Sequence, residues 1–179
     1  MGKAPQTSPF NPPGRGPPEG QRGFVDNALG TILVVEDDAD HSALIQAVFR
    51  YRSPASVIRI ASTGREALDY LEGLPPYNDR AKNPLPEVII LDLDLPGMNG
   101  FDVLSWLSMS AEHSKIPVVM FTASTDPADE RKAFSLGAHA FKSKPENFGE
   151  LVEVVLDAAG RQLGPDSLSS GDGDIDKVV

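Results

Sequence analysis

The stretch Val88-Ile89-Ile90-Leu91-Asp92-Leu93-Asp94 decides the fold, because four apolar residues run directly into a segment with two carboxylates. An apolar run without alternation is typical of a strand that is buried on both faces of a parallel sheet. Three other apolar runs lead to polar residues in the same way, at Glu36-Asp37, Thr122 and Lys144. The carboxyl ends of parallel strands meet at one edge of the sheet, where open α/β folds bind ligands. We therefore expect a functional site at this edge.

Helical patterns separate the apolar runs. Thr63-Gly64-Arg65-Glu66 is typical of a capping box, and Asp126-Pro127 of an N-cap followed by proline at the first helical position. Apolar residues at helical spacing are expected to face the core in three further segments: Leu44, Ala47, Val48 and Tyr51; Phe101, Leu104 and Leu107; and Leu151, Val152 and Val155. Five strands, each followed by a helix, predict an α/β fold with a doubly wound parallel sheet.

The two ends of the chain differ in composition from the part between them. Residues 1–29 are rich in proline and glycine, and residues 164–179 are rich in glycine, serine and aspartate. Neither segment has enough apolar residues to offset the entropy of ordering the chain. We predict a disordered arm, one domain over residues 30–163, and a disordered acidic tail that leaves no room for an effector domain.

Composition narrows the expected setting. The formal net charge of −10 opposes a nucleic acid partner, because affinity for phosphate backbones comes from clustered lysine and arginine. The sequence has no cysteine, so we exclude disulfides and thiolate zinc sites. It also lacks an apolar stretch long enough to span a bilayer and a secretory signal. We expect a cytoplasmic protein with no membrane partner.

The acidic residues at the strand ends predict a metal site. Glu36, Asp37 and Asp92 would repel one another at one sheet edge unless a cation neutralised them. A hard divalent ion with oxygen ligands, most naturally Mg²⁺, suits this set. We expect Asp37 and Asp92 to be direct ligands, Glu36 to act through water, and the backbone carbonyl of Asp94 to be a further ligand.

The same residues predict phosphoryl chemistry. A carboxylate beside Mg²⁺ can act as a nucleophile toward phosphorus and form an aspartyl phosphate, and Asp92 is the candidate. Lys144 would supply a second positive charge to the transferring group, and Thr122 would donate its hydroxyl to a phosphoryl oxygen.

Four motifs, in this order along the chain, resemble the receiver domain of two-component response regulators. They are Ile32 to Asp38, Asp92 to Gly100, Val118 to Ala123, and Lys144-Pro145. The resemblance covers about Thr31 to Leu163 and implies a flavodoxin-like (βα)5 fold with strand order 2-1-3-4-5. It implies that Asp92 accepts a phosphoryl group from a histidine kinase or a histidine phosphotransfer protein.

The resemblance also implies a conformational switch made of Thr122 and Phe141. Phe141 lacks the hydroxyl of the tyrosine that many receivers have there. The expected output surface comprises the fourth helix, the fifth strand and the fifth helix. Val154 and Leu156 are interpreted either as part of a homodimer contact through this surface or as simply buried. The long segment from Leu74 to Pro86 resembles that of stand-alone receivers paired with phytochrome-type kinases.

Other interpretations stay open at this stage. Asp92-Leu93-Asp94 also resembles the signature of haloacid dehalogenase-type phosphatases, in which the second aspartate is a general acid and base. A receiver fold could also serve as a scaffold that is never phosphorylated. The acidic run from Glu36 could be a helix N-terminus, Thr122 a capping hydroxyl and Lys144 a surface charge. His41, His113 and His139 lack metal-ligand spacing and are given no role.

Overall fold

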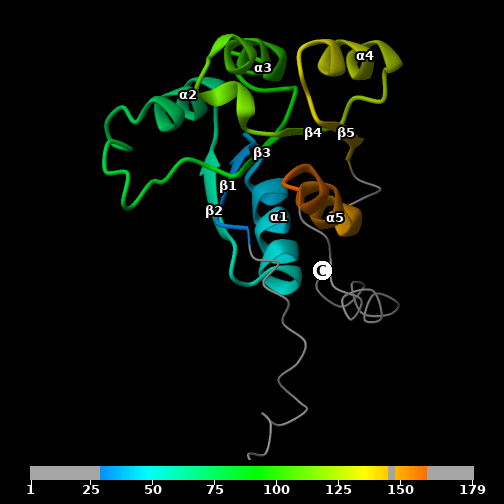
Figure 1. The fold of residues 1–179 in the computed structure, drawn as a ribbon. Coiled ribbons are helices and arrows are strands. Elements are labelled where there is room, and N and C mark those ends of the chain that lie inside the picture. The colour runs from blue at the N-terminus through cyan, green and yellow to red at the C-terminus, as the bar shows by residue number, and fades with distance from the viewer. Residues whose placement is uncertain (1–28, 145–147, 161–179) are drawn as a thin grey trace, which may run out of the picture.

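The computed structural model describes residues 29–144 and 148–160 (Figure 1). Within these ranges five parallel strands form one sheet in the order β2-β1-β3-β4-β5, which confirms the expected topology. In chain order the elements are β1 (Thr31–Val35), α1 (Ala39–Arg52), β2 (Val57–Ala61), α2 (Gly64–Glu72), β3 (Val88–Leu91), α3 (Gly100–Met109), the 3-10 turn η1 (His113–Lys115), β4 (Val118–Thr122), α4 (Pro127–Ser135), β5 (Ala140–Ser143) and α5 (Phe148–Ala158).

Helices cover both faces of the sheet. Helices α1 and α5 pack on one face, where Ile45 and Val155 belong to a core cluster with strand residues such as Ile32 and Ile90. Helices α2, α3 and α4 pack on the other face (Figure 1). Successive strand residues point to opposite faces, so β1, β3 and β4 are buried along their whole length. This explains their continuous apolar runs.

The register of the strands sets where their polar ends lie. Val35 pairs with Leu91, so Glu36 and Asp92 follow their strands at the same level. Between β4 and β5, Thr122 pairs with Ser143, so Lys144 comes one residue further. The backbone continues the pairing past the strands, because Asp92 N donates to Val35 O at 3.0 Å and Lys144 N donates to Thr122 O at 2.7 Å.

Side-chain caps start the helices close to this edge. Asp38 is the N-cap of α1 and accepts hydrogen bonds from the backbone N–H groups of Asp40 and His41. Asn99 and Asp102 form a reciprocal capping box at the start of α3. Asp126 caps α4, as the Asp126-Pro127 pair predicted. The caps fix short turns between strand and helix, so the residues at the strand ends are held by ordered backbone on both sides.

Two packing expectations are wrong, and for Leu156 the structure decides between the two alternatives in favour of burial. Leu44 and Tyr51 on α1 are exposed, and the buried residues of this helix are instead Ser42, Ile45 and Phe49. The arm was expected to include Leu29, but this side chain is fully buried among residues of β1, β3 and α5, so the packed domain begins before residue 30. Leu156 is also buried, because it faces the sheet from α5, and it is not available to an outer dimer surface.

The long connection between α2 and β3 is tied to α2 by side-chain contacts. The guanidinium of Arg80 donates to the backbone oxygens of Tyr70 and Leu71 in the last turn of α2. The hydroxyl of Tyr77 donates to Glu66 in the first turn. Burial, followed by the contact with Glu66, raises the pKa of Tyr77 to about 12. The connection is therefore anchored at both ends of the helix. In the described residues no helix has the length and apolarity needed to span a bilayer.

Candidate functional site

The register brings Glu36 and Asp92 together at the carboxyl edge of the central strands. Both side chains are nearly inaccessible, with relative exposures of 3% for Glu36 and 6% for Asp92. By strand alternation both point toward the face covered by α1 and α5. Two buried carboxylates at this spacing need positive charge or hydrogen-bond donors around them.

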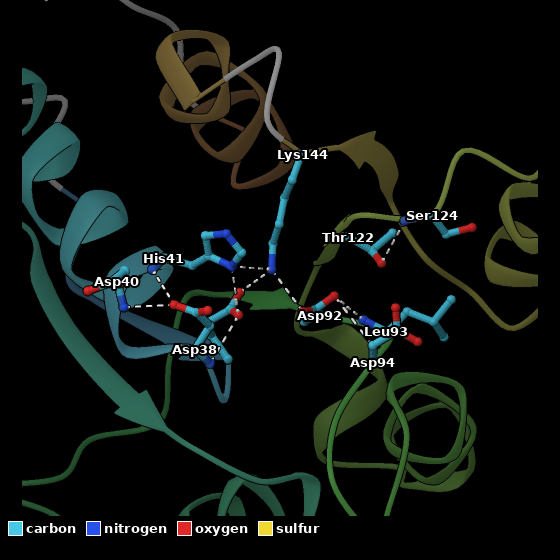
Figure 2. A network of polar contacts seen from close by, with 10 residues as sticks. Asp38, Asp40, His41, Asp92, Leu93, Asp94, Thr122, Ser124 and Lys144 are labelled. Atoms are coloured by element: carbon cyan, nitrogen blue, oxygen red, sulfur yellow. Dashed lines mark hydrogen bonds and ion pairs between the residues drawn. The ribbon is translucent and has the colours of Figure 1, made fainter.

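Lys144 supplies that charge from the end of β5. Its ammonium forms an ion pair with Oε2 of Glu36 and another with Oδ2 of Asp92, the second at 2.8 Å. The Lys144 side chain is only 3% exposed, so this is a buried cation shared by two carboxylates (Figure 2). Lys144 is therefore not a solvated surface charge.

Asp37 completes an acidic cluster. One oxygen from each of Glu36, Asp37 and Asp92 can be chosen so that all three atoms lie within 4.8 Å of one another. Asp37 is exposed, while the other two carboxylates are buried, so the cluster is open to solvent on one side. Three oxygen donors at this spacing, with one open side, fit a hard divalent cation that keeps some of its waters.

The two oxygens of Asp92 have different partners. Oδ1 accepts hydrogen bonds from the backbone N–H groups of Leu93 at 2.7 Å and Asp94 at 3.5 Å, and Oδ2 contacts Lys144. The backbone thus holds the carboxylate in one orientation. Asp94 itself is exposed, and the role expected of its carbonyl stays a prediction.

Thr122 lies at the end of β4, next to the backbone of Lys144. Its side chain is fully buried, and its hydroxyl oxygen accepts a hydrogen bond from Ser124 N at 3.2 Å. The Ser124 hydroxyl donates to Asp129 in the first turn of α4 at 2.6 Å, so the loop after β4 is tied to that helix. Phe141 is half-buried and pairs with Met120, which places Phe141 and Thr122 on the same face of neighbouring strands.

His41 is a site residue that sequence reasoning missed. Its Nδ1 lies 3.3 Å from Oε1 of Glu36 and 3.5 Å from Nζ of Lys144 (Figure 2). Its position in the sequence could have identified it, because His41 is the third residue of the helix that Asp38 caps. The backbone N–H of His41 also holds the pKa of the Asp38 carboxyl below its ordinary value. His113 is buried beside Ser110 and Trp106, and His139 is exposed at the opposite end of β5.

The fold and the site together define a class of protein. A parallel α/β sheet with an acidic cluster at its carboxyl edge, next to a buried aspartate that contacts a buried lysine, is the architecture of a phosphoacceptor signalling domain. The chain belongs to the response regulator receiver domain family, because the model of that family matches residues 32–156. The expected resemblance is therefore confirmed.

Two curated relatives cover most of the domain. The chain is 35% identical over 133 residues to the probable methanogenesis regulatory protein FilR2 of Methanothrix harundinacea, a match that covers 74% of this chain and 83% of that protein. It is 30% identical over 129 residues to the response regulator Rcp1 of Synechocystis, a match that covers 72% of this chain and 86% of Rcp1.

Solved structures of response regulators share the fold. The phosphorylated cyanobacterial phytochrome response regulator RcpA superposes with a TM-score of 0.64 at 27% identity, over 73% of this chain and 91% of RcpA. The Mn²⁺-bound form of Rcp1 superposes with a TM-score of 0.63 at 28% identity, over 75% of this chain and 95% of Rcp1. These relatives support a phosphoacceptor response regulator, and neither the phosphatase nor the unphosphorylated scaffold is favoured.

Proposed function

We propose that Asp92 accepts a phosphoryl group from a phosphohistidine of a histidine kinase or a histidine phosphotransfer protein, in a reaction that requires Mg²⁺. The observation that carries the proposal is the contact of Lys144 with both Asp92 and Glu36, next to a cluster of three carboxylate oxygens within 4.8 Å. Receiver domains act with such donors and bind a divalent metal at an acidic pocket.

The chemistry requires few groups. A carboxylate oxygen of Asp92 forms a bond to phosphorus while the bond from phosphorus to the imidazole nitrogen of the donor breaks, and the imidazole leaves. The Lys144 ammonium lies 2.8 Å from Oδ2 of Asp92, where it can contact the transferred oxygens. The Thr122 hydroxyl can donate to another of these oxygens. Hydrolysis of the acyl phosphate by water later returns the free carboxylate and inorganic phosphate.

The proposed metal ligands are Asp37 and Asp92 directly, Glu36 through water, and the backbone carbonyl of Asp94. When bound, the metal neutralises charge on the phosphoryl group. The choice of Mg²⁺ rests on the all-oxygen donor set and the open side at Asp37.

The proposed output is a switch that starts at Thr122. Movement of Thr122 toward the phosphoryl group would leave space for Phe141 on the same sheet face and would pull on Ser124, which contacts α4 through Asp129. We propose that a partner protein in the cytoplasm, or a second copy of this chain, then binds the surface of α4, β5 and α5. Phe134 on α4, which is 47% exposed, supports this surface, whereas the buried Leu156 does not contribute to it.

The test is the intact mass after incubation with Mg²⁺ and a small acyl phosphate. The wild type is expected to gain one phosphoryl group, and Asp92→Ala is expected to gain none. Elution volume of the same samples reports whether assembly depends on phosphorylation. Absence of labelling in the wild type would overturn the proposal.

Asp94→Asn separates this function from a phosphatase. In the phosphatase interpretation the Asp94 carboxyl is needed for every turnover of a phosphomonoester. In the proposed function only its backbone carbonyl is used, so the variant should still label. Sustained release of phosphate from a phosphomonoester by the wild type, lost in Asp94→Asn, would identify a hydrolase instead.

A further inference from the structure

The carboxylate of Glu36 is held by three groups, two from the start of α1 and one from the end of β5. Its Oε2 contacts the ammonium of Lys144, and its Oε1 accepts a hydrogen bond from Asp38 N at 3.3 Å. The third group is Nδ1 of His41, at 3.3 Å from Oε1. A glutamate side chain has one more rotatable bond than aspartate, so it needs more contacts to keep one orientation.

The contact with His41 holds for either tautomer of the imidazole. When Nδ1 carries the hydrogen, it donates to Oε1 of Glu36. When Nδ1 carries the lone pair, it can accept the third hydrogen of the Lys144 ammonium, whose nitrogen is 3.5 Å away. In both cases the ring is bonded to one member of the Glu36–Lys144 ion pair.

The His41 side chain also reaches from this ion pair to solvent. The side chains of Glu36 and Lys144 are 2% and 3% exposed, whereas that of His41 is 40% exposed. The His41 ring lies 6.2 Å from the ring of Phe148 at the start of α5. A buried ion pair in contact with a third polar group is held more strongly than the pair alone.

We propose that His41 is a positioning residue of the divalent metal site, acting through Glu36 and Lys144. This inference rests on the proposed function, because it takes Glu36 as part of that site. Outer groups that orient metal-binding carboxylates change metal affinity by about 10-fold to 100-fold when removed. Since Glu36 is proposed to act through water, we expect about 10-fold weaker binding without His41, the lower end of that range.

Three variants separate the polar contact from the bulk of the ring. His41→Ala removes both. His41→Phe keeps a ring beside Phe148 but has no nitrogen at the Nδ1 position. His41→Asn lacks the ring but can place an amide near that position. His139→Ala is the matched control, because it removes an exposed histidine at the opposite end of β5.

The experiment measures the dissociation constant of Mn²⁺ from the electron paramagnetic resonance signal of free Mn²⁺, with no phosphodonor present. We expect Kd to rise about 10-fold in His41→Ala and His41→Phe, and His41→Asn and His139→Ala to stay within about 3-fold of the wild type. Circular dichroism checks that every variant is folded. Equal Kd values for the wild type, His41→Ala and His41→Phe would overturn the proposal, and so would weak binding by His41→Asn.

Phosphorylation gives a second readout on the same samples. The Mg²⁺ concentration needed for half-maximal labelling of Asp92 should rise by the same factor in His41→Ala and should stay at the wild-type value in His139→Ala. If Asp92 is labelled in the wild type and the metal dependence of His41→Ala is unchanged, only the role of His41 is refuted. If the wild type neither binds Mn²⁺ nor becomes labelled, the proposed function is refuted as well.

Discussion

At the scale of single residues, Lys144 compensates the charge of the buried site. It is the cation that contacts both Glu36 and Asp92, so Lys144→Met leaves two buried carboxylates facing each other. Removing one partner of a buried ion pair costs about 3–5 kcal/mol, because the other charge stays buried. We predict a loss of this size in the free energy of unfolding, measured in urea without divalent metal.

The matched control for Lys144 is Lys82→Met. The Lys82 side chain is 80% exposed and pairs with Asp79 on the surface, so its removal should change stability by less than about 1 kcal/mol. Added Mg²⁺ should recover part of the loss in Lys144→Met. A Lys144→Met variant as stable as Lys82→Met would show that the carboxylates are solvated rather than buried.

Gly100 is a second residue with a specific physical requirement. A Cβ at this position would overlap the backbone oxygen of Asp92 and lie 2.9 Å from Cα of Leu93. Gly100→Ala should therefore push α3 away from the phosphoacceptor loop and cost about 1–3 kcal/mol, the usual range for overpacking. Gly97→Ala is the comparison, because Gly97 has φ of +78° but no atom within 4 Å of the added carbon.

The two glycine variants should differ in the site as well as in stability. Gly97→Ala carries only the backbone penalty of positive φ, about 1–2 kcal/mol, and should leave Asp92 in place. Gly100→Ala should also slow labelling of Asp92 by a small acyl phosphate. Equal labelling rates in the two variants would mean that α3 can move without disturbing the loop after β3.

The residues of the site were largely predictable from the sequence. Glu36, Asp92 and Lys144 each follow an apolar run, and parallel strands in register place such residues at one edge. His41 was not predictable in this way, because it belongs to no strand end. Its place depends on the exact start of α1, and helix boundaries are the least reliable part of sequence-based assignment.

At the scale of elements, helix α1 is the element whose buried face differs from the one that the sequence pattern predicted. Two stripes on this helix have helical spacing, and the structure buries Ile45 and Phe49 but leaves Leu44 and Tyr51 exposed. Tyr51 is 75% exposed, whereas Phe49 is 1% exposed. Periodicity identifies a helix but does not select between two apolar faces. That choice is made by the cap at Asp38 and the packing against the sheet.

This assignment of faces predicts different effects for two aromatic residues that are two positions apart. Phe49→Ala should lower the free energy of unfolding by about 3–5 kcal/mol, because it opens a cavity in the core. Tyr51→Ala should change it by no more than about 0.5 kcal/mol. Chemical denaturation of both variants is the measurement. Similar losses of unfolding free energy in both variants would show that the helix face containing Tyr51 is buried after all.

In the connection between α2 and β3, the raised pKa of Tyr77 predicts a loss of stability at alkaline pH. The folded-state pKa of Tyr77 is about 12, above its ordinary value of 10.0, so the protonated phenol stabilises the folded state. This contribution is complete below pH 10 and is lost as the pH rises from about 10 to 12. We predict that Tyr77→Phe reduces the fall in stability across this window.

The measurement is the urea midpoint of unfolding at a series of pH values from neutral to alkaline. Tyr77→Phe should also cost about 1 kcal/mol at neutral pH, because it removes the hydrogen bond to Glu66. Tyr51→Phe serves as the control, since Tyr51 is exposed on α1. If Tyr77→Phe and the wild type lose stability in parallel above pH 10, the phenol does not carry this dependence.

At the scale of the whole molecule, the site joins parts of the chain that are far apart in sequence. Lys144 and Glu36 are separated by 108 residues, and their contact links the end of β5 to the end of β1 across the carboxyl edge of the sheet. The acidic cluster likewise joins the loops after β1 and β3. A ligand that binds at this edge therefore binds only the folded arrangement, and its affinity adds to the stability of the whole domain.

Metal binding should accordingly raise the global stability of the protein. At a Mg²⁺ concentration 100 times its Kd the gain is about 2.7 kcal/mol, provided that the unfolded chain does not bind the ion. Asp37→Asn should abolish most of this gain, because it removes one of the three carboxylates. Without metal it should be at least as stable as the wild type, since Asp37 is exposed and one repulsive charge is lost.

The experiment compares urea unfolding with and without Mg²⁺ at constant ionic strength, so that screening of the overall charge of −10 is the same in both. Asp40→Asn is the matched control, because Asp40 is an exposed carboxylate on the first turn of α1 outside the cluster. The wild type and Asp40→Asn should gain stability to the same extent, and Asp37→Asn should gain little. An equal gain in all three proteins would place the stabilising ion elsewhere, because only Asp37→Asn removes a carboxylate of the cluster.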